Sequence, residues 1–503
     1  MHGTYSNKAD RGTLMNREFL LNALFLVFVN LLVKPFYVFG IERTIQDTVG
    51  AESYGLYATL YSFTFLLFMV NDFGIHYFNN TSIAKHPRLI GKYFPNILVV
   101  KSLLTVLYLL LVFVAALARG FEAAVFYLLF FIAINHVLIS LTAYLRSNIS
   151  GLGMYRTDSA VSTLDKLLLI GVCAALLWGG VLPGSFRIEW FVHAQNLTWA
   201  LTALTAFFIV KKHVRGSLRL RIHRPMLFFI LKSSAPYALA VFLMTAYTRL
   251  DIVLVEWLLP DGRHEAGVYA AAYRLLDASN MVGFLFAGLL LPMFSSMLRN
   301  RDADLANRED LTSLLRLSLQ LIWAGTVTVA VACCFFREEL MQWMYPLTAT
   351  PYYGEVLTFV ILTLVPFSGV FIYSTLLTAN GSLRKMNRIF LAGIALNLTL
   401  NLLLIPGYRA VGAGISAIVT QTLVLACMMF LAKKELSLRA DIRQVAKIAV
   451  FVLLVVVANG MLYHLADVAW LYRFAGGLAA GGCLAFVLRL VQMKALTGLL
   501  KKT

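Results

Sequence analysis

Long apolar runs alternate with short polar connections along the whole chain. Each run holds about 18 or more predominantly apolar residues, which is enough for an α-helix to cross the hydrocarbon of a bilayer. The pattern therefore predicts an all-α polytopic membrane protein with about fourteen transmembrane helices. The predicted spans are residues 19–39, 54–72, 93–117, 123–145, 160–179, 190–210, 226–259, 267–297, 314–336, 356–378, 389–406, 411–432, 445–465 and 468–490.

Lysine and arginine are concentrated in every second connection. The connections on the same side as the N-terminus hold several of these residues each, and the stretch 211–224 (KKHVRGSLRLRIHR) is the densest. Each connection on the opposite side holds one arginine, and these are Arg43, Arg119, Arg187, Arg263, Arg337, Arg409 and Arg473. Since short loops rich in lysine and arginine stay in the cytoplasm, both termini are predicted to be cytoplasmic.

The composition agrees with a membrane protein. The 503 residues are 60% hydrophobic and only 14% charged, with a mean hydropathy of +0.77, whereas soluble domains are nearer 45–50% apolar and 25% charged. The net charge of +18 follows from the basic connections, which favour anionic lipid headgroups over nucleic acid as partners. The five cysteines lie inside apolar runs with no C-x-x-C motif, so they indicate small buried apolar residues rather than disulfides or a metal site.

A short motif occurs twice in the chain. Residues 55–61 (GLYATLY) and 267–273 (GVYAAAY) share a glycine, two tyrosines and an alanine at corresponding positions. The copies lie six predicted spans apart, so both enter the membrane from the same side. This spacing favours a parallel repeat of two six-helix lobes. The predicted domains are an N-lobe at 1–210, a basic cytoplasmic linker at 211–225, a C-lobe at 226–432, and two C-terminal helices at 433–503.

Several segments together carry the pattern of a known family. They are residues 50–57 (GAESYGLY), 71–74 (NDFG), 249–251 (RLD), 267–274 (GVYAAAYR), 397–406 (NLTLNLLLIP) and 412–415 (GAGI). In these segments the sequence resembles bacterial polysaccharide flippases of the Wzx type, which translocate lipid-linked sugars. The same motifs recur in a wider superfamily that includes multidrug exporters of the MATE type and MurJ-type lipid II flippases.

The resemblance implies a fold and a function. In that superfamily, two six-helix lobes enclose a central cavity that opens alternately to either side of the membrane, and fourteen helices fit the flippase branches better than MATE exporters. The implied function is translocation of a polyprenyl-diphosphate-linked oligosaccharide to the outer leaflet of the bacterial inner membrane, for polysaccharide or lipopolysaccharide (O-antigen) biosynthesis. No cofactor is expected. Other polysaccharide assembly proteins are candidate partners.

Ionisable residues inside the predicted spans mark candidate pathway positions, because a charge in hydrocarbon is costly. Lys34, Arg249 and Arg274 are the candidate substrate-binding cations. The resemblance favours Lys34 and Arg274, since MurJ-like members carry functional cations on the first and eighth helices. An arginine would offer two parallel hydrogen bonds to the oxygens of a diphosphate. The alternatives are snorkelling of Lys34 to the interface, neutralisation of Arg274 by Asp277, and structural pairing of Arg249 across helices.

Four aspartates inside or at the ends of spans are candidates for coupling or gating: Asp72, Asp165, Asp251 and Asp277. Asp72 stands at the end of its span, so a cap or gate role is favoured over proton coupling. Asp165 is followed by Lys166, and the two can equally form an ion pair within one lobe.

Four tyrosines of the repeated motif, Tyr57, Tyr61, Tyr269 and Tyr273, are candidates for contact with the sugar. Aromatic rings stack on flat faces of ligands, but most aromatic residues in a membrane protein face lipid or the interfaces.

Three other functions stay open. A membrane polymerase or ligase is disfavoured, because the chain has no large outer loop, no Ser/His/Asp set, no H-E-x-x-H motif and no P-loop motif. A MATE-like exporter is disfavoured by the first span, 19–39, which contains no Asp or Glu, whereas MATE exporters often use an acidic residue there. A MurJ-like lipid II flippase is the third alternative.

Overall fold

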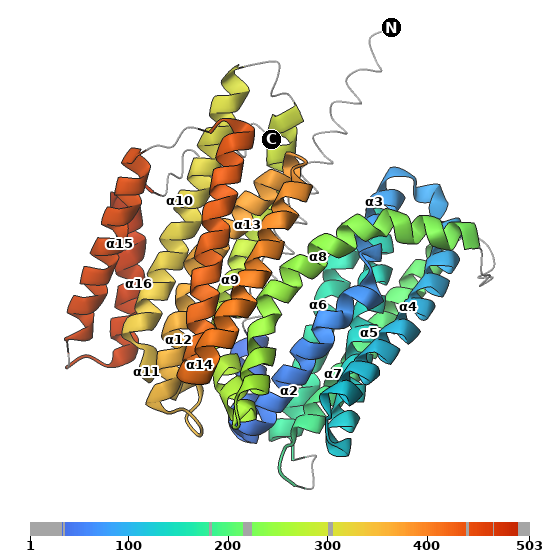
Figure 1. Ribbon diagram of the computed structural model, residues 1–503, viewed down its shortest axis with the longest axis horizontal. Helices are drawn as coiled ribbons and strands as arrows, with labels where there is room; N and C mark the ends of the chain where they lie inside the picture. The colour runs from blue at the N-terminus through green and yellow to red at the C-terminus, as the bar shows by residue number, and fades with distance from the viewer. Residues whose placement is uncertain are drawn as a thin grey trace. The chain divides into compact units, whose positions relative to one another are not determined.

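The computed structural model describes residues 33, 36–180, 184–214, 224–299, 305–438, 442–465 and 467–490. Throughout these residues the regular structure is helical, with no strand (Figure 1). The predicted all-α membrane fold is confirmed. Within the described residues, nine helical segments are long and apolar enough to cross a membrane.

The chain divides into two compact units. Unit 1 comprises the chain up to Val49 and from Tyr57 to Leu250, and unit 2 comprises Gly50–Leu56 and everything from Asp251 onward. The domain boundaries expected from the sequence stay predictions. The helices that begin in unit 1 are η1 (Tyr37–Glu42), α2 (Arg43–Asp72), α3 (Ile75–Lys85), η2 (Pro87–Leu89), α4 (Ile90–Arg119), α5 (Ala123–Gly151), α6 (Tyr155–Trp178), α7 (Ile188–His213) and α8 (Arg224–Leu258). Those that begin in unit 2 are α9 (Gly262–Arg299), α10 (Leu305–Phe335), α11 (Arg337–Met344), α12 (Pro351–Leu362), α13 (Leu364–Ala379), α14 (Leu383–Leu436), α15 (Ile442–Tyr463) and α16 (Trp470–Val487).

Two helices contain a sharp break. Gly50 in α2 has φ 81° and ψ 164°, a conformation open to glycine but strained for residues with a Cβ. Arg409 in α14 has φ 56° and ψ −137°, although it is not a glycine. These breaks separate the first predicted span from the second and the eleventh from the twelfth, while α12 and α13 together form the tenth. The prediction of about fourteen helices is thereby confirmed, although most of the first predicted span, 19–39, lies outside the described residues.

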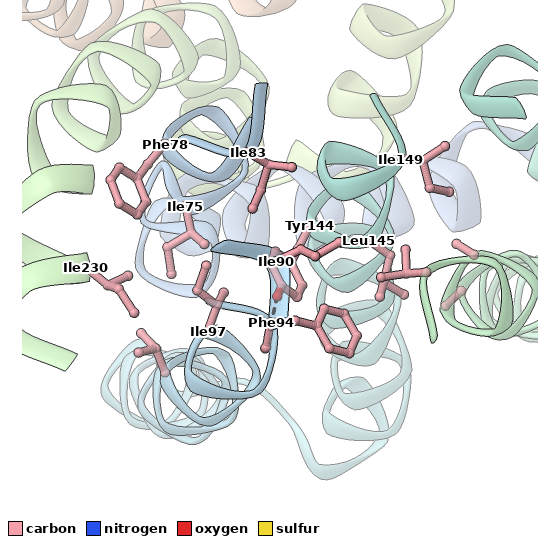
Figure 2. Close-up of a cluster of buried hydrophobic side chains, with 14 of the residues drawn as sticks. Ile75, Phe78, Ile83, Ile90, Phe94, Ile97, Tyr144, Leu145, Ile149 and Ile230 are labelled. Carbon is pink, nitrogen blue, oxygen red and sulfur yellow. Dashed lines mark hydrogen bonds between the residues drawn. The ribbon is translucent and has the colours of Figure 1, made fainter. Parts of the chain in front are cut away.

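An apolar cluster of unit 1 joins the six helices α3 to α8 (Figure 2). Ile75 and Phe78 from α3 share this cluster with Phe94 from α4 and Tyr144 from α5, and the Tyr144 hydroxyl donates a hydrogen bond to the Phe94 carbonyl oxygen at 3.1 Å. Ile230 from α8 joins the same cluster. The first part of α8 is therefore packed into unit 1, although the helix continues into unit 2.

Unit 2 contains a very close helix crossing between the segment Gly50–Leu56 and α9. A Cβ atom placed on Gly55 would overlap the carbonyl oxygen of Arg263, and one placed on Gly267 would overlap that of Ala51. Small residues let helix backbones approach closely in membranes, where packing rather than the hydrophobic effect drives association. The first glycine of each repeated motif is therefore a contact point of this crossing.

A second contact region of unit 2 joins α10, α15 and α16. Val327, Phe451 and Val455 are buried there. Gly481 lies against Thr328, and Gly477 lies against Asn459, with no room for a Cβ at either glycine. The two C-terminal helices thus pack on α10 through small residues, side by side with each other (Figure 1).

Candidate functional site

Arg274 is a buried cation of α9 in unit 2. Its guanidinium carbon lies 4.7 Å from the centroid of the Tyr54 ring, and its Nη2 donates a hydrogen bond to the Tyr54 hydroxyl. Tyr54 belongs to the segment that crosses α9 at the glycine contact, so the crossing fixes the aromatic ring beside the cation. Asp277 lies three residues further along α9 and is half-buried. Lys34, the other favoured cation, lies outside the described residues.

Asp251 of α8 is a buried carboxylate that neutral groups surround. Its Oδ1 accepts hydrogen bonds from Asn397 Nδ2 at 2.9 Å and from Asn401 Nδ2 at 2.7 Å, both on α14. Its Oδ2 accepts one from the Tyr269 hydroxyl at 3.1 Å, on α9. In the described part of the chain, no lysine or arginine forms an ion pair with it. The carboxylate thus joins three helices of unit 2 without a neutralising cation among them.

The repeated tyrosines differ in their surroundings. Tyr269 is buried, donates to Asp251, and stacks on the half-buried Tyr273 with ring centroids 5.9 Å apart. Tyr57, in unit 1, is also buried, and Gln195 Nε2 donates to its hydroxyl oxygen at 2.9 Å. Tyr61 is half-buried, with its ring centroid 4.6 Å from that of His136. Tyr61 and Tyr273 are therefore the more accessible pair of the four.

Asp72 forms a buried ionic cluster in unit 1. Its Oδ1 lies 3.5 Å from Lys101 Nζ, and its Oδ2 lies 2.7 Å from His76 Nδ1. Oδ2 also accepts the backbone N–H of Gly74 at 3.1 Å, and Lys101 Nζ donates to the hydroxyl of Ser140. The cluster fixes the end of α2 against α4 and α5. A helix-end position for Asp72 was expected from the sequence, whereas these partners were not.

Asp165 and Lys166 of α6 form an ion pair at 3.3 Å, with the aspartate buried. Lys166 Nζ also lies 4.6 Å from the centroid of the Tyr37 ring in η1 and 5.6 Å from that of Trp199 in α7. Two aromatic faces and one carboxylate therefore surround this ammonium within unit 1. Aromatic faces attract cations electrostatically, and the attraction increases where water is excluded.

Arg249 lies in unit 1, although it is only two residues from Asp251. Its guanidinium carbon is 5.8 Å from the centroid of the Phe65 ring. Residues two apart on a helix point in different directions, and here the division between the units falls at this point of α8. The structure thus places the candidate cations Arg249 and Arg274 in different units.

A polar network that the sequence does not predict lies at the break in α14. Glu265 of α9 is buried and accepts the Tyr352 hydroxyl at 2.7 Å and the backbone N–H of Ala410 at 3.2 Å. Arg409 Nε lies 3.4 Å from Glu265, and its Nη2 pairs with Asp261. These contacts hold Arg409 in its positive-φ conformation, which costs about 1–3 kcal/mol. The sequence shows here only an arginine that follows Gly407 and Tyr408. Such a pattern does not predict which residues the arginine contacts.

Within the described residues, no group of three or more His, Cys, Asp or Glu is placed to hold a metal ion.

Comparison with known proteins decides the family. The model of the family described as "Polysaccharide biosynthesis protein" matches residues 19–298, which is more than half of the chain. The chain belongs to this family. The match runs from the first predicted span through α9 and includes both copies of the repeated motif. A search among curated protein sequences gives no significant match.

Solved structures share the fold of this family member. A lipid II flippase MurJ in an inward closed conformation is similar with a TM-score of 0.65 and 14% identity, covering 94% of this chain and 98% of that one. An inward-facing multidrug resistance MATE family transporter of the MOP superfamily has a TM-score of 0.61 and 13% identity, covering 78% and 94%. A MOP superfamily transporter from Pyrococcus furiosus has a TM-score of 0.57 and 15% identity, covering 83% and 95%. At these identities the likeness shows the fold alone.

Proposed function

We propose that the protein is a flippase. It translocates a polyprenyl-diphosphate-linked oligosaccharide from the cytoplasmic to the outer leaflet by alternating access, for polysaccharide biosynthesis. Membership of the polysaccharide biosynthesis family supports this proposal, and so does a fold shared with a lipid II flippase over 94% of the chain. The MurJ match covers 94% of this chain and the MATE match covers 78%, which favours the flippase over the MATE-like exporter.

The observation that carries the proposal is a buried arginine within the eighth predicted span, 267–297. Arg274 is only 6% exposed, and an ionisable residue inside a membrane span marks a substrate pathway by default. A lipid diphosphate carries negative charge that must cross a low-dielectric layer. A fixed guanidinium offsets that cost through bidentate hydrogen bonds to phosphate oxygens. Lys34 and Arg249 are also proposed as substrate-binding cations.

The acidic residues are proposed to couple or gate the movement. Among them Asp251 is the best placed, because within the described residues its hydrogen-bond partners are neutral amides and a hydroxyl rather than a lysine or arginine. Protonation or cation binding would therefore change the charge of the site itself. Asp72 and Asp165 each face a lysine at 3.5 Å and 3.3 Å, which suits a structural or gating role. Asp277 is proposed to set the charge beside Arg274.

The proposal includes location and orientation. The protein would lie in the bacterial inner membrane with both termini in the cytoplasm, since the basic connections are on the N-terminal side. It would act by transport rather than by covalent catalysis. Tyr61 and Tyr273, the accessible pair of the repeated tyrosines, are proposed to contact the sugar, whereas Tyr57 and Tyr269 would support neighbouring polar side chains.

Complementation of a strain that lacks this gene tests the proposal. Surface glycan is measured for Arg274→Gln, Arg274→Lys and the control Arg119→Gln at matched levels of membrane-inserted protein. Arg119 is an exposed arginine at the end of α4. We expect Arg274→Gln to lose nearly all export, Arg274→Lys to keep part of it, and Arg119→Gln to match the wild type. Full export by Arg274→Gln would refute the role of this cation.

A further inference from the structure

Three aromatic rings form a continuous ladder along one face of α2 in unit 1. Tyr61, Phe65 and Phe68 are spaced four and three residues apart, which places them on the same side of the helix. The rings of Tyr61 and Phe65 are 6.1 Å apart and those of Phe65 and Phe68 are 5.1 Å apart, both with an interplanar angle of 10°. All three side chains are half-buried, so each keeps an accessible part.

A histidine of α5 packs against the whole ladder. The centroid of His136 lies 4.6 Å from Tyr61, 5.3 Å from Phe65 and 5.8 Å from Phe68. The imidazole is fully buried, and the Tyr108 hydroxyl lies 3.4 Å from its Nδ1. Its Nε2 has no hydrogen-bond partner in the described part of the chain. A buried polar atom without a partner lowers stability by about 1–3 kcal/mol, and a hydroxyl that reaches this nitrogen would remove that cost.

The arginine beside the ladder indicates what kind of surface the ladder borders. Arg249 of α8 lies with its guanidinium carbon 5.8 Å from the Phe65 centroid and is half-buried. A charged side chain within a membrane span almost always faces the bundle interior or a water-filled cavity. Arg249 therefore favours a hydrated path, rather than lipid acyl chains, beside the ladder at Phe65.

We propose that the ladder of Tyr61, Phe65 and Phe68 is a carbohydrate-binding platform for the glycan of the lipid-linked cargo, an inference that rests on the proposed function. The C–H groups on one face of a pyranose ring are weakly positive, and they stack on the negative faces of aromatic rings. Arg249, whose guanidinium lies over the Phe65 ring, donates hydrogen bonds to sugar hydroxyls, while the buried His136 supports the rings from within unit 1. Successive parallel rings hold successive positions of the glycan, so it moves along the ladder without a single tight site.

The platform tolerates different sugars, because every pyranose has an apolar face. It supplies affinity for the sugar, whereas the diphosphate depends on the cations. These two contributions can be measured separately. Replacing Phe65 or Phe68 by leucine keeps an apolar side chain of similar size but removes the flat ring. Phe63 is the matched control, since it lies on the same helix and packs edge-on against Phe121 at 6.1 Å, outside the ladder.

The test is binding to the purified full-length protein in lipid nanodiscs. Two probes are compared: geranylgeranyl diphosphate, and the same lipid diphosphate carrying a chitobiose disaccharide. For the wild type we expect the sugar-linked probe to bind more tightly. Phe65→Leu and Phe68→Leu should each reduce that difference by roughly three- to tenfold, the range for one aromatic contact, without changing the affinity for the sugar-free lipid. Phe63→Leu should keep the difference in affinity, and so should Phe65→Trp, which retains a flat ring.

Each result decides the proposal. If the wild type binds both probes equally, or if Phe63→Leu reduces the difference as much as Phe65→Leu, the platform is only core packing and the inference is wrong, while the proposed function stands. If the wild type binds neither probe, the proposed function fails and the platform fails with it.

Discussion

The Tyr54 ring lies beneath the guanidinium of Arg274, with 4.7 Å between the ring centroid and Arg274 Cζ, although 220 residues separate the two in the sequence. The tyrosine comes from the segment just after the break at Gly50, and the arginine comes from α9. Their contact lies next to the glycine crossing of unit 2. The position of the proposed headgroup cation is therefore set by how closely two helix backbones approach.

Removing the aromatic partner should weaken this arrangement. Tyr54→Phe keeps the ring but loses the hydroxyl that accepts from Arg274, and a hydrogen bond to a charged group contributes about 1.5–3 kcal/mol. Tyr54→Leu also loses the cation–π contact, worth roughly another 1–2 kcal/mol when water is excluded. Thermal unfolding in detergent should rank the wild type above Tyr54→Phe and Tyr54→Phe above Tyr54→Leu. Equal stability of all three would contradict the contact.

Side chains at the glycine crossing should not be tolerated. Gly267→Ala places a Cβ onto the Ala51 carbonyl oxygen, and relieving such an overlap by backbone movement costs about 1–3 kcal/mol or more. We expect a lower unfolding temperature and reduced accumulation in the membrane. Gly325→Ala in α10 is the control, because no atom lies within 4 Å of its added Cβ. A stable Gly267→Ala variant would mean that the helices do not cross here.

Two substitutions should separate the structural role of Asp251 from its coupling role. Asp251→Leu leaves the amides of Asn397 and Asn401 without their acceptor, so the unfolding free energy should fall by about 1–3 kcal/mol for each group. Asp251→Asn keeps a side-chain oxygen as acceptor and should fold. With Asp251→Asn we expect transport to lose its response to an imposed proton or sodium gradient. An unchanged response would remove Asp251 from the coupling mechanism.

The pair of Lys101 and Asp72 should behave as a buried ion pair. Lys101→Met leaves the carboxylate of Asp72 buried without its lysine, and breaking such a pair costs about 3–5 kcal/mol. The double variant Lys101→Met/Asp72→Asn removes both charges and should be more stable than Lys101→Met alone. A double-mutant cycle measured by thermal unfolding checks this. Additive effects would show that the two residues do not interact.

Much of the fold was predictable from local patterns. Apolar runs gave the spans because membrane helices must be long and satisfy their own backbone hydrogen bonds. The repeated motif located Gly55 and Gly267, and the structure shows why glycine is needed at both. The break at Arg409 was also visible as a polar connection, but a non-glycine residue with positive φ is held by its ion pairs, which local sequence does not reveal.

The site was only partly predictable, because its partners lie far apart in the chain. Asp251 was a candidate from its place in a span, yet Asn397 and Asn401 are 146 and 150 residues away. The hydropathy pattern likewise does not predict that the His136 ring packs against the aromatic ladder of α2. Such contacts depend on helix rotation and register, which apolar runs leave undetermined.

Reconstitution in proteoliposomes measures translocation of the lipid-linked sugar itself. The purified protein is incorporated into vesicles with a short polyprenyl diphosphate that carries a fluorescently labelled disaccharide, and a membrane-impermeant quencher reports how fast the label changes leaflet. We expect rapid transfer with the wild type, a rate near that of protein-free vesicles with Arg274→Gln, and the wild-type rate with Arg119→Gln. Transfer by the wild type no faster than in protein-free vesicles would contradict the proposed flippase function.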